Sequence, residues 1–204
     1  MEATPGHARS TLPAVTIVPG YRPAIVARAV EMNMAFYLPA KGWSRLFEAH
    51  MAADLGHLLN RLDKPINQVW SAVMTTAPGP SDQSGGSPVE RTVGVVCVDG
   101  ECSGEAGVAR LRYFVVDESV KGLGIGKNLF RAAMDFVREA GFRECRLSTM
   151  PDLTAARKLY EREGFSLVSE GVFDAFDRPV TELNYVWRRP EERAAIDATS
   201  PAGM

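Results

Sequence analysis

The stretch from Val108 to Phe165 constrains the fold more than any other part of this chain. An apolar strand pattern at 108–116 is followed by a glycine-rich turn and by a helix-period pattern that ends at Gly141. A second strand pattern at 143–149 and a second helix pattern at 153–163 come next. A strand–helix–strand unit of this length is almost always a right-handed crossover between parallel strands. The stretch therefore predicts two neighbouring parallel strands, with helices packed against their sheet.

The segments on either side predict antiparallel strands and two further helices. Apolar residues recur at helical spacing over 24–37, and again over 47–62 until Asp63-Lys64-Pro65 ends the pattern. The other expected strands are one near 15–21, a pair at 68–75 and 92–98, and a closing hairpin at 165–170 and 181–188. The predicted fold class is α/β (α+β), with a mixed, mostly antiparallel central sheet of about six to seven strands and helices on both faces.

A single domain over 14–189 accounts for this pattern, because 204 residues suit one hydrophobic core. Residues 1–13 are polar and predict a mobile leader, and residues 190–204 predict a charged tail. The Pro-, Gly- and Ser-rich stretch 77–91 predicts a flexible hairpin loop inside the domain rather than a domain boundary.

The composition excludes several classes of function. A net charge of −2 does not supply the basic surface that nucleic-acid binding needs. No apolar run approaches the roughly 18–20 residues of a membrane span, and the polar N-terminus is not a signal peptide. The three cysteines, Cys97, Cys102 and Cys145, form no CxxC pair, so neither a disulfide framework nor a zinc site is expected. We therefore expect no nucleic-acid, membrane or metal partner and a cytoplasmic location.

The turn Lys121-Gly122-Leu123-Gly124-Ile125-Gly126 carries the clearest chemical signal, because it joins a strand to the start of a helix. Glycines allow positive φ and let main-chain N–H groups converge on one point. The first N–H groups of a helix have no intrahelical partner, and the helix dipole adds partial positive charge there. The turn therefore predicts an anion site, most naturally for a phosphate or pyrophosphate.

The spacing of the turn excludes two common phosphate sites. A P-loop needs glycine where Lys121 stands and Ser or Thr where Asn128 stands. The dinucleotide fingerprint GxGxxG needs glycine at 127 or 129, and it belongs to the first strand of a parallel unit. A kinase or an oxidoreductase is therefore disfavoured. The simpler alternative, a turn that only connects strand to helix, stays open at this point.

Two motifs resemble those of the GNAT superfamily of N-acetyltransferases. Lys121-x-x-Gly124-x-Gly126 is similar to the acyl-CoA pyrophosphate motif [RQ]-x-x-G-x-[GA], with Lys in the first position. The segment "AARKLYEREGF", which begins at Ala155, is similar to the family's A-x-x-L-Y-E-x-x-G-F. Residues 111–142 also resemble the acetyltransferase half of bacterial regulators that fuse a MarR-type domain to a GNAT domain. The DNA-binding half of those regulators is not expected in this chain.

The resemblance implies transfer of an acetyl group from acetyl-CoA to an amine. It implies that N–H groups of 123–127 hold the pyrophosphate and that the backbone of 114–116 holds pantetheine, between parallel strands that separate near Val116 and Ser148. Lys127, Arg131 and Lys158 are candidates for the phosphates. Many relatives have Asn where Leu153 stands, so that hydrogen bond is lost or moves to Asp152. The implied cofactor-binding residues are Phe114, Val115, Val116, Lys121, Gly122, Leu123, Gly124, Ile125, Gly126, Lys127, Ser148, Asp152, Ala156, Lys158 and Tyr160.

The chemistry of acetyl transfer asks for an acid and a base. The resemblance implies that Tyr160 protonates the leaving thiolate, and a core aromatic is the alternative for this residue. A main-chain N–H near Val116 is the expected oxyanion donor. The sequence ranks none of the candidate bases, which are Glu48, His50, Glu101, Glu105, Asp174 and Glu182.

The expected partner is a small-molecule or peptide amine. Candidates for lining its site are Tyr37, Trp43, Trp70, Phe173 and Phe176. No acidic cluster dominates the sequence, so a polyamine-specific pocket is not indicated. A homodimer formed through sheet edges is a further option, and no residue in the sequence argues for or against it. The alternative function is a non-catalytic acyl-CoA-binding regulatory module, which would keep the phosphate turn without a productive base.

Overall fold

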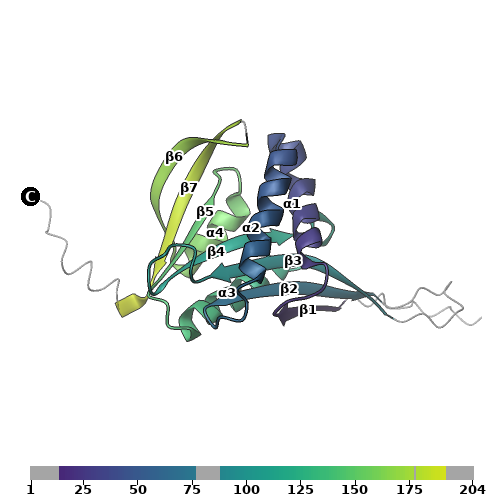
Figure 1. Cartoon of the computed structure of the whole chain (residues 1–204), viewed down its shortest axis with the longest axis horizontal. Coiled ribbons are helices and arrows are strands. Elements are labelled where there is room, and N and C mark those ends of the chain that lie inside the picture. Colours follow the sequence, from purple (N-terminus) through teal and green to yellow (C-terminus); the bar gives the residue numbers. More distant parts are fainter. Residues whose placement is uncertain (1–13, 77–87, 177, 192–204) are drawn as a thin grey trace, which may run out of the picture.

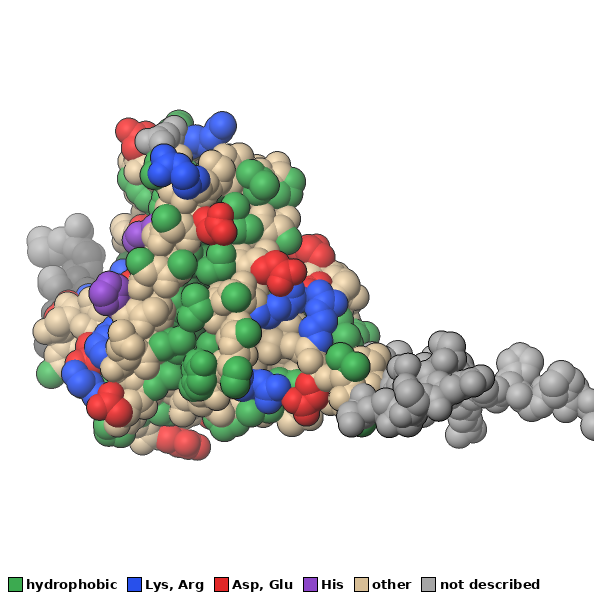
Figure 2. Space-filling view, turned by 45° about the vertical axis from the view of Figure 1, so that its right-hand side comes forward, with side chains coloured by type: hydrophobic (Ala, Val, Ile, Leu, Met, Phe, Trp, Pro, Cys, Tyr) green, Lys and Arg blue, Asp and Glu red, His purple; other side chains and the backbone are tan. Residues whose placement is uncertain are grey.

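The computed structural model describes residues 14–76, 88–176 and 178–191. The expected leader 1–13, most of the expected loop 77–91 and most of the expected tail 190–204 lie outside the described residues. Among the residues described, no helix is long and apolar enough to cross a membrane. On the face seen in Figure 2, acidic and basic side chains lie interspersed rather than gathered by sign.

Seven described strands form one sheet in the order β1-β2-β3-β4-β5-β7-β6 (Figure 1). Of these strands only β4 and β5 pair in parallel, and every other neighbouring pair is antiparallel. The predicted fold class is therefore confirmed. The strands are β1 (Ala14–Pro19), β2 (Asn67–Thr76), β3 (Val89–Asp99), β4 (Val108–Val116), β5 (Glu144–Thr149), β6 (Ser166–Ala175) and β7 (Arg178–Arg188).

Four α-helices cover the two faces of this sheet in the described part of the chain (Figure 1). α1 (Ile25–Lys41) and α2 (Arg45–Leu59) bury their apolar sides in a core with Val69, Val95 and Cys97, on one face. α3 (Ile125–Glu139) and α4 (Thr154–Glu163) pack on the other face, where Leu129 and Tyr160 join a second core. The helices predicted on both faces are thus confirmed, and the sheet is buried on both sides at its centre.

Two element boundaries differ from the expected ones in ways that matter for the site. β3 begins at Val89 rather than near residue 92. The closing hairpin is also longer than predicted, because β6 continues to Ala175 and β7 starts at Arg178. The added length carries the tip of the hairpin up to the turn between α1 and α2, where Phe176 contacts Trp43.

Candidate functional site

The two parallel strands separate after a short ladder. β4 and β5 pair only from Val108 to Arg110 against Glu144 to Arg146, although both strands continue beyond these residues. β4 stays paired with β3 on its outer side, and β5 stays paired with β7. The predicted separation of the parallel strands is therefore confirmed, and their facing main-chain groups are free to pair with an extended molecule.

A bulge in β4 contributes to this separation. Val95 pairs with Val115 and Cys97 pairs with Arg112, so β4 has one residue more than β3 over the same interval. Within the bulge Tyr113 has a φ of 53°, in the left-handed region that favours glycine. Bulges bend the strand that contains them and increase its twist. The end of β4 thus turns away from β5 before it reaches the glycine-rich turn.

The glycine-rich turn follows β4 through a short 3-10 helix at Glu118–Val120. Gly122 and Gly124 have φ values of 84° and 74°, and Gly124 caps α3 without any side-chain cap. Among the described residues, the N–H groups of 122–127 find no acceptor outside α3 itself. A Cβ built on Gly122 or Gly124 would meet no atom within 4 Å, so open space lies beside these N–H groups. The arrangement is that of an anion site at a helix N-terminus.

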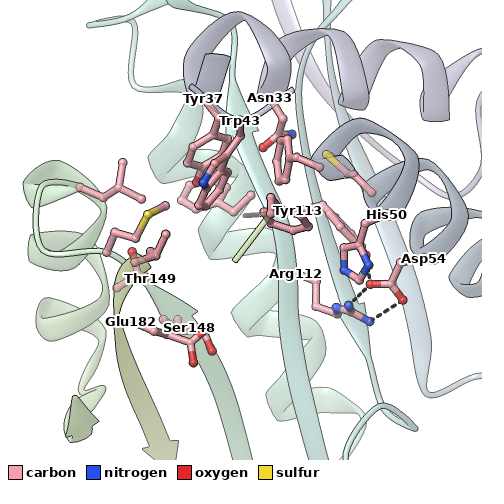
Figure 3. A pocket seen from close by; sticks show the side chains of 18 of the residues that line it. Asn33, Tyr37, Trp43, His50, Asp54, Arg112, Tyr113, Ser148, Thr149 and Glu182 are labelled. Atoms are coloured by element: carbon pink, nitrogen blue, oxygen red, sulfur yellow. Dashed lines mark hydrogen bonds and ion pairs between the residues drawn. The ribbon is translucent and has the colours of Figure 1, made fainter. Parts of the chain in front are cut away.

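A cavity of about 290 Å³ opens between the separated strands, α2 and the β6–β7 hairpin (Figure 3). Its walls combine aromatic and aliphatic side chains with a small number of polar groups. Two buried polar atoms in these walls, Thr149 Oγ1 and Trp43 Nε1, have no hydrogen-bond partner among the described residues. The lining includes Asn33, Tyr37, Trp43, Phe47, His50, Met51, Asp54, Arg112, Tyr113, Phe114, Ser148, Thr149, Met150, Tyr160, Phe173, Phe176, Val180 and Glu182.

The hairpin tip encloses one end of this cavity. The Phe176 ring lies 5.1 Å from the rings of both Trp43 and Phe47, and Trp43 stacks on Tyr37 at 4.8 Å. Phe176 adopts a φ of 54°, which is strained for a bulky residue and is held by this aromatic packing. We refer to Tyr37, Trp43, Phe47 and Phe176 as the aromatic cluster.

Comparison with known proteins matches these features to one family. The model of the Acetyltransferase (GNAT) family matches residues 84–165, which include the separated strands and the glycine-rich turn. Over these residues the chain is similar to the GNAT acetyltransferases.

One named relative shares part of the sequence, and solved structures share the fold. Human N-acetyltransferase 8B is 25% identical over 162 residues, which are 78% of this chain and 66% of that protein. The solved structure of a GCN5-related N-acetyltransferase from Kribbella flavida superposes with a TM-score of 0.63 and 18% identity, covering 86% of this chain and 98% of that one. A chain of the NatC complex, solved with a Gag peptide and CoA, gives a TM-score of 0.62 and 17% identity over 86% of this chain and 98% of that one.

Tyr160 lies on α4 and is 5% exposed, and it lines the cavity beside Phe114. Burial raises the pKa of its phenol well above the ordinary value, and Tyr37 adds to the effect. The phenol therefore keeps its proton at neutral pH. Tyr160 also packs on Phe130 and Phe165 in the core, so its ring is a core aromatic while the residue borders the cavity.

A second polar group in the cavity joins α2 to the β4 bulge. Asp54 accepts hydrogen bonds from the Arg112 guanidinium and from the Tyr113 hydroxyl (Figure 3). Burial raises the pKa of Tyr113, and its hydrogen bond to Asp54 raises it further. No sequence pattern connects Asp54 with these partners, which lie 58 and 59 positions away. Its only local signal is that it follows the candidate base His50 by one helical turn.

The six candidate bases fall into two groups. His50 and Glu182 line the cavity, with the His50 ring 5.6 Å from that of Phe176. The structure places the other four, Glu48, Glu101, Glu105 and Asp174, outside the cavity lining. Glu101 pairs with Arg61 and Lys64, and Glu105 pairs with Arg146.

The candidate acceptor-site aromatics divide in a similar way. Tyr37, Trp43, Phe173 and Phe176 line the cavity. Trp70 does not, and its expected place was wrong: it packs against Phe136 of α3, on the opposite face of the sheet. Neighbouring residues of a strand point to opposite faces, and here Val69 takes the side of α1 and α2.

The charged residues expected near the phosphates lie at the surface. Lys127 on α3 and Lys158 on α4 are exposed. Arg131 on α3 donates a hydrogen bond to the Asn128 side chain. Lys121 forms an ion pair with Glu118. Asp152, considered as a substitute for the family's Asn, is held by Lys41 at 2.8 Å. Within the described part of the chain, no cluster of His, Cys, Asp or Glu could hold a metal ion.

Proposed function

We propose that this protein transfers an acetyl group from acetyl-CoA to the amine of a small molecule or peptide. The observation that carries the proposal is that β4, which separates from β5, leads into the turn with the unblocked N–H groups at the start of α3. Acetyl-CoA combines a pantetheine chain with two amides and a pyrophosphate, so it offers a partner for both features. Free strand edges and open space beside Gly122 and Gly124 fit such a molecule.

In this proposal the residues named from the sequence bind different parts of acetyl-CoA. The N–H groups of Leu123 to Lys127 bind the pyrophosphate, helped by the helix dipole. The main chain of Phe114 to Val116 pairs with the amides of pantetheine as an added strand. Binding energy from these remote parts positions the thioester in the cavity. Lys121, Ser148, Asp152, Ala156 and Lys158 border the path of the donor, and their individual contributions stay predictions.

The reaction itself needs few groups. An uncharged amine attacks the thioester carbonyl carbon, a main-chain N–H near Val116 stabilises the negative oxygen, and the C–N bond forms. The C–S bond then breaks, the Tyr160 phenol gives its proton to the sulfur, and the phenolate takes the second proton of the nitrogen as the amide forms. The base that first takes the proton of the acceptor ammonium is one of the cavity residues.

The relatives support this proposal without extending it to a substrate. The human protein carries the name N-acetyltransferase, and the NatC structure holds CoA and a peptide. A cytoplasmic location and a homodimer through sheet edges stay predictions. A non-catalytic acyl-CoA-binding module is the alternative, and it differs in lacking turnover.

Two measurements test the function. Calorimetric titration with CoA, ATP and NAD should give saturable binding with CoA alone. Thiol release from acetyl-CoA, followed over a library of amines, should then give turnover with at least one amine. Absence of CoA binding contradicts the proposal, and CoA binding without thiol release for any amine supports the non-catalytic module.

A further inference from the structure

The walls of the cavity change from apolar to polar in one direction. On β7, Val180 is buried beside the aromatic cluster, and Glu182 follows it on the same face of the strand. Directly after the end of β5, the buried Met150 lies beyond Ser148 of that strand. On α2, Phe47 of the cluster precedes His50 and Asp54 by one and two helical turns. Three independent elements therefore give the cavity one apolar end and one polar end.

Of the two carboxylates at the polar end, one has a bonded partner among the described residues and one does not. Asp54 is compensated by the Arg112 guanidinium. Glu182 is half-buried, and it has no hydrogen bond or ion pair with any residue that the structure describes. A carboxylate that is partly removed from water without a partner favours a cation beside it. An ammonium group is the cation that an amine acceptor brings.

The dimensions of the cavity limit the molecule that can join the two ends. Residues two apart on a strand lie about 6.6 Å apart, so an ammonium at Glu182 and a group at Val180 are separated by roughly that distance. The 290 Å³ of the cavity correspond to about ten water molecules at about 30 Å³ each. The acceptor end that enters is therefore small, with an apolar part a few carbon atoms from its nitrogen.

We propose that the acceptor is a primary amine with an alkyl or aryl end. Glu182 binds its ammonium group and takes its proton, while the aromatic cluster and Val180 bind its apolar end. One proton passes from the ammonium to the Glu182 carboxylate, and the nitrogen lone pair forms the C–N bond. The electron pair of the broken C–S bond leaves with sulfur, and the second proton of the nitrogen replaces the one that Tyr160 gave to sulfur. This inference rests on the proposed acetyl transfer and names its substrate class.

A series of linear amines tests the apolar end. From propylamine to hexylamine, kcat/KM for acetylation should rise about three- to fourfold for each methylene until the cavity is filled. Phenylethylamine should also be a good acceptor. Putrescine has the same chain length as pentylamine but places a second ammonium in the apolar end, so its kcat/KM should be at least tenfold lower. Equal or better use of putrescine and ethanolamine would overturn the inference.

The substitution Glu182→Gln tests the polar end. It should raise the KM for phenylethylamine about tenfold or more, because a hydrogen bond between charged partners is lost. Aniline, which is uncharged at neutral pH, needs no proton removed before it attacks the thioester, so its kcat/KM should change less than twofold. A merely structural defect would lower both reactions alike. Glu170→Gln removes an exposed carboxylate from β6 outside the cavity and serves as the matched control.

The outcomes separate this inference from the function on which it rests. Wild-type protein that binds CoA and acetylates polar amines best keeps the proposed function and overturns the substrate class. Equal loss toward phenylethylamine and aniline in Glu182→Gln, with an unchanged melting temperature, excludes Glu182 as the group that binds and deprotonates the ammonium. No CoA binding at all overturns both proposals. Binding of phenylethylamine to the CoA-loaded protein, measured by calorimetry, provides a readout that does not depend on turnover.

Discussion

The substitution Gly124→Ala tests the role of the glycine-rich turn, and Gly141→Ala is its matched control. Gly124 caps the N-terminal end of α3 with a φ of 74°, and Gly141 follows the C-terminal end of the same helix with a φ of 78°. A Cβ built on either glycine meets no atom within 4 Å. The two changes therefore strain the backbone alike and clash with nothing in the protein. Only the methyl group at position 124 lies beside the free N–H groups of the turn.

The expected magnitudes follow from this geometry. An L residue held in the left-handed region costs roughly 1–2 kcal/mol, and each 1 kcal/mol lowers the melting temperature of a chain of this size by about 2–4 °C. Both variants should therefore melt about 2–8 °C below the wild type. A hydrogen bond from an N–H to a charged oxygen contributes about 1.5–3 kcal/mol. Losing one should weaken CoA binding about 10- to 100-fold, in Gly124→Ala alone.

Calorimetric titration of CoA and thermal melts of the three proteins are sufficient to check this prediction. The informative quantity is the difference in CoA affinity between two variants of equal stability, because general destabilisation affects both. Equal CoA affinity of Gly124→Ala and Gly141→Ala would refute the reasoning. The turn would then be a connection between strand and helix, and the pyrophosphate would have to bind elsewhere.

Three further predictions concern Tyr160, Asp54 and Asp99. Tyr160→Phe should lower kcat about 100-fold or more and leave the Kd for CoA within about twofold, as measured by thiol release and calorimetry; an unchanged kcat would remove the acid role. Asp54→Asn should weaken the link from α2 to the β4 bulge and raise the KM for the acceptor while the Kd for CoA stays constant, and the reverse pattern would contradict this. Burial by itself raises the pKa of Asp99, but hydrogen bonds from Arg61 and from the Glu101 N–H outweigh it, so the net pKa lies below its usual value. The Lys64 ammonium and the Asn67 amide lower the pKa of Glu101 to about 2. Both carboxylates therefore stabilise the fold above their unfolded pKa values and lose this contribution as pH falls from about 4.5 toward 2. Asp99→Asn should lower the free energy of unfolding at pH 7 by about 2 kcal/mol and flatten its acid dependence in urea titrations, and an unchanged acid dependence would contradict this role.

The parts of the fold that could be predicted are those that depend on local patterns. The parallel unit was predictable because a strand, a glycine turn and an amphipathic helix follow one another within one stretch of chain. The conformation of the glycine-rich turn was predictable because it depends on Gly122, Gly124 and the start of α3 alone. The separation of β4 from β5 came from the family resemblance, and the pairing of Val108 to Arg110 shows where it begins.

The parts that could not be predicted depend on which face of the sheet a residue takes. Trp70 and Val69 are both buried, but helices cover both faces of β2, so an apolar run gives no alternation from which to assign them. The contact of Asp54 with Arg112 and Tyr113 depends on a bulge that changes the direction of two side chains in β4. Nothing local to α2 indicates it.

The closing hairpin is a further case in which sequence signals were outweighed. Gly171 and Pro179 are typical of a loop, yet both lie in strands, β6 and β7. β6 is the edge strand, so few ladder bonds depend on its glycine, and Pro179 lies near the turn where a missing donor costs little. The aromatic contacts of Phe176 at the tip then provide the apolar burial that a glycine and a proline cannot.

The same physical condition explains why a site exists at this place in the sheet. Among the described strands β4 and β5 are the one parallel pair, and each keeps an antiparallel partner on its outer edge, so they can separate without losing their outer ladders. The separation leaves main-chain N–H and C=O groups unpaired between them, and such groups need a partner when water is excluded. A molecule that is itself peptide-like in one part and anionic in another satisfies the strand edges and the start of α3 together. Closing the gap with a full β4–β5 ladder would stabilise the sheet and block the route that we propose for the thioester to the cavity beside Tyr160.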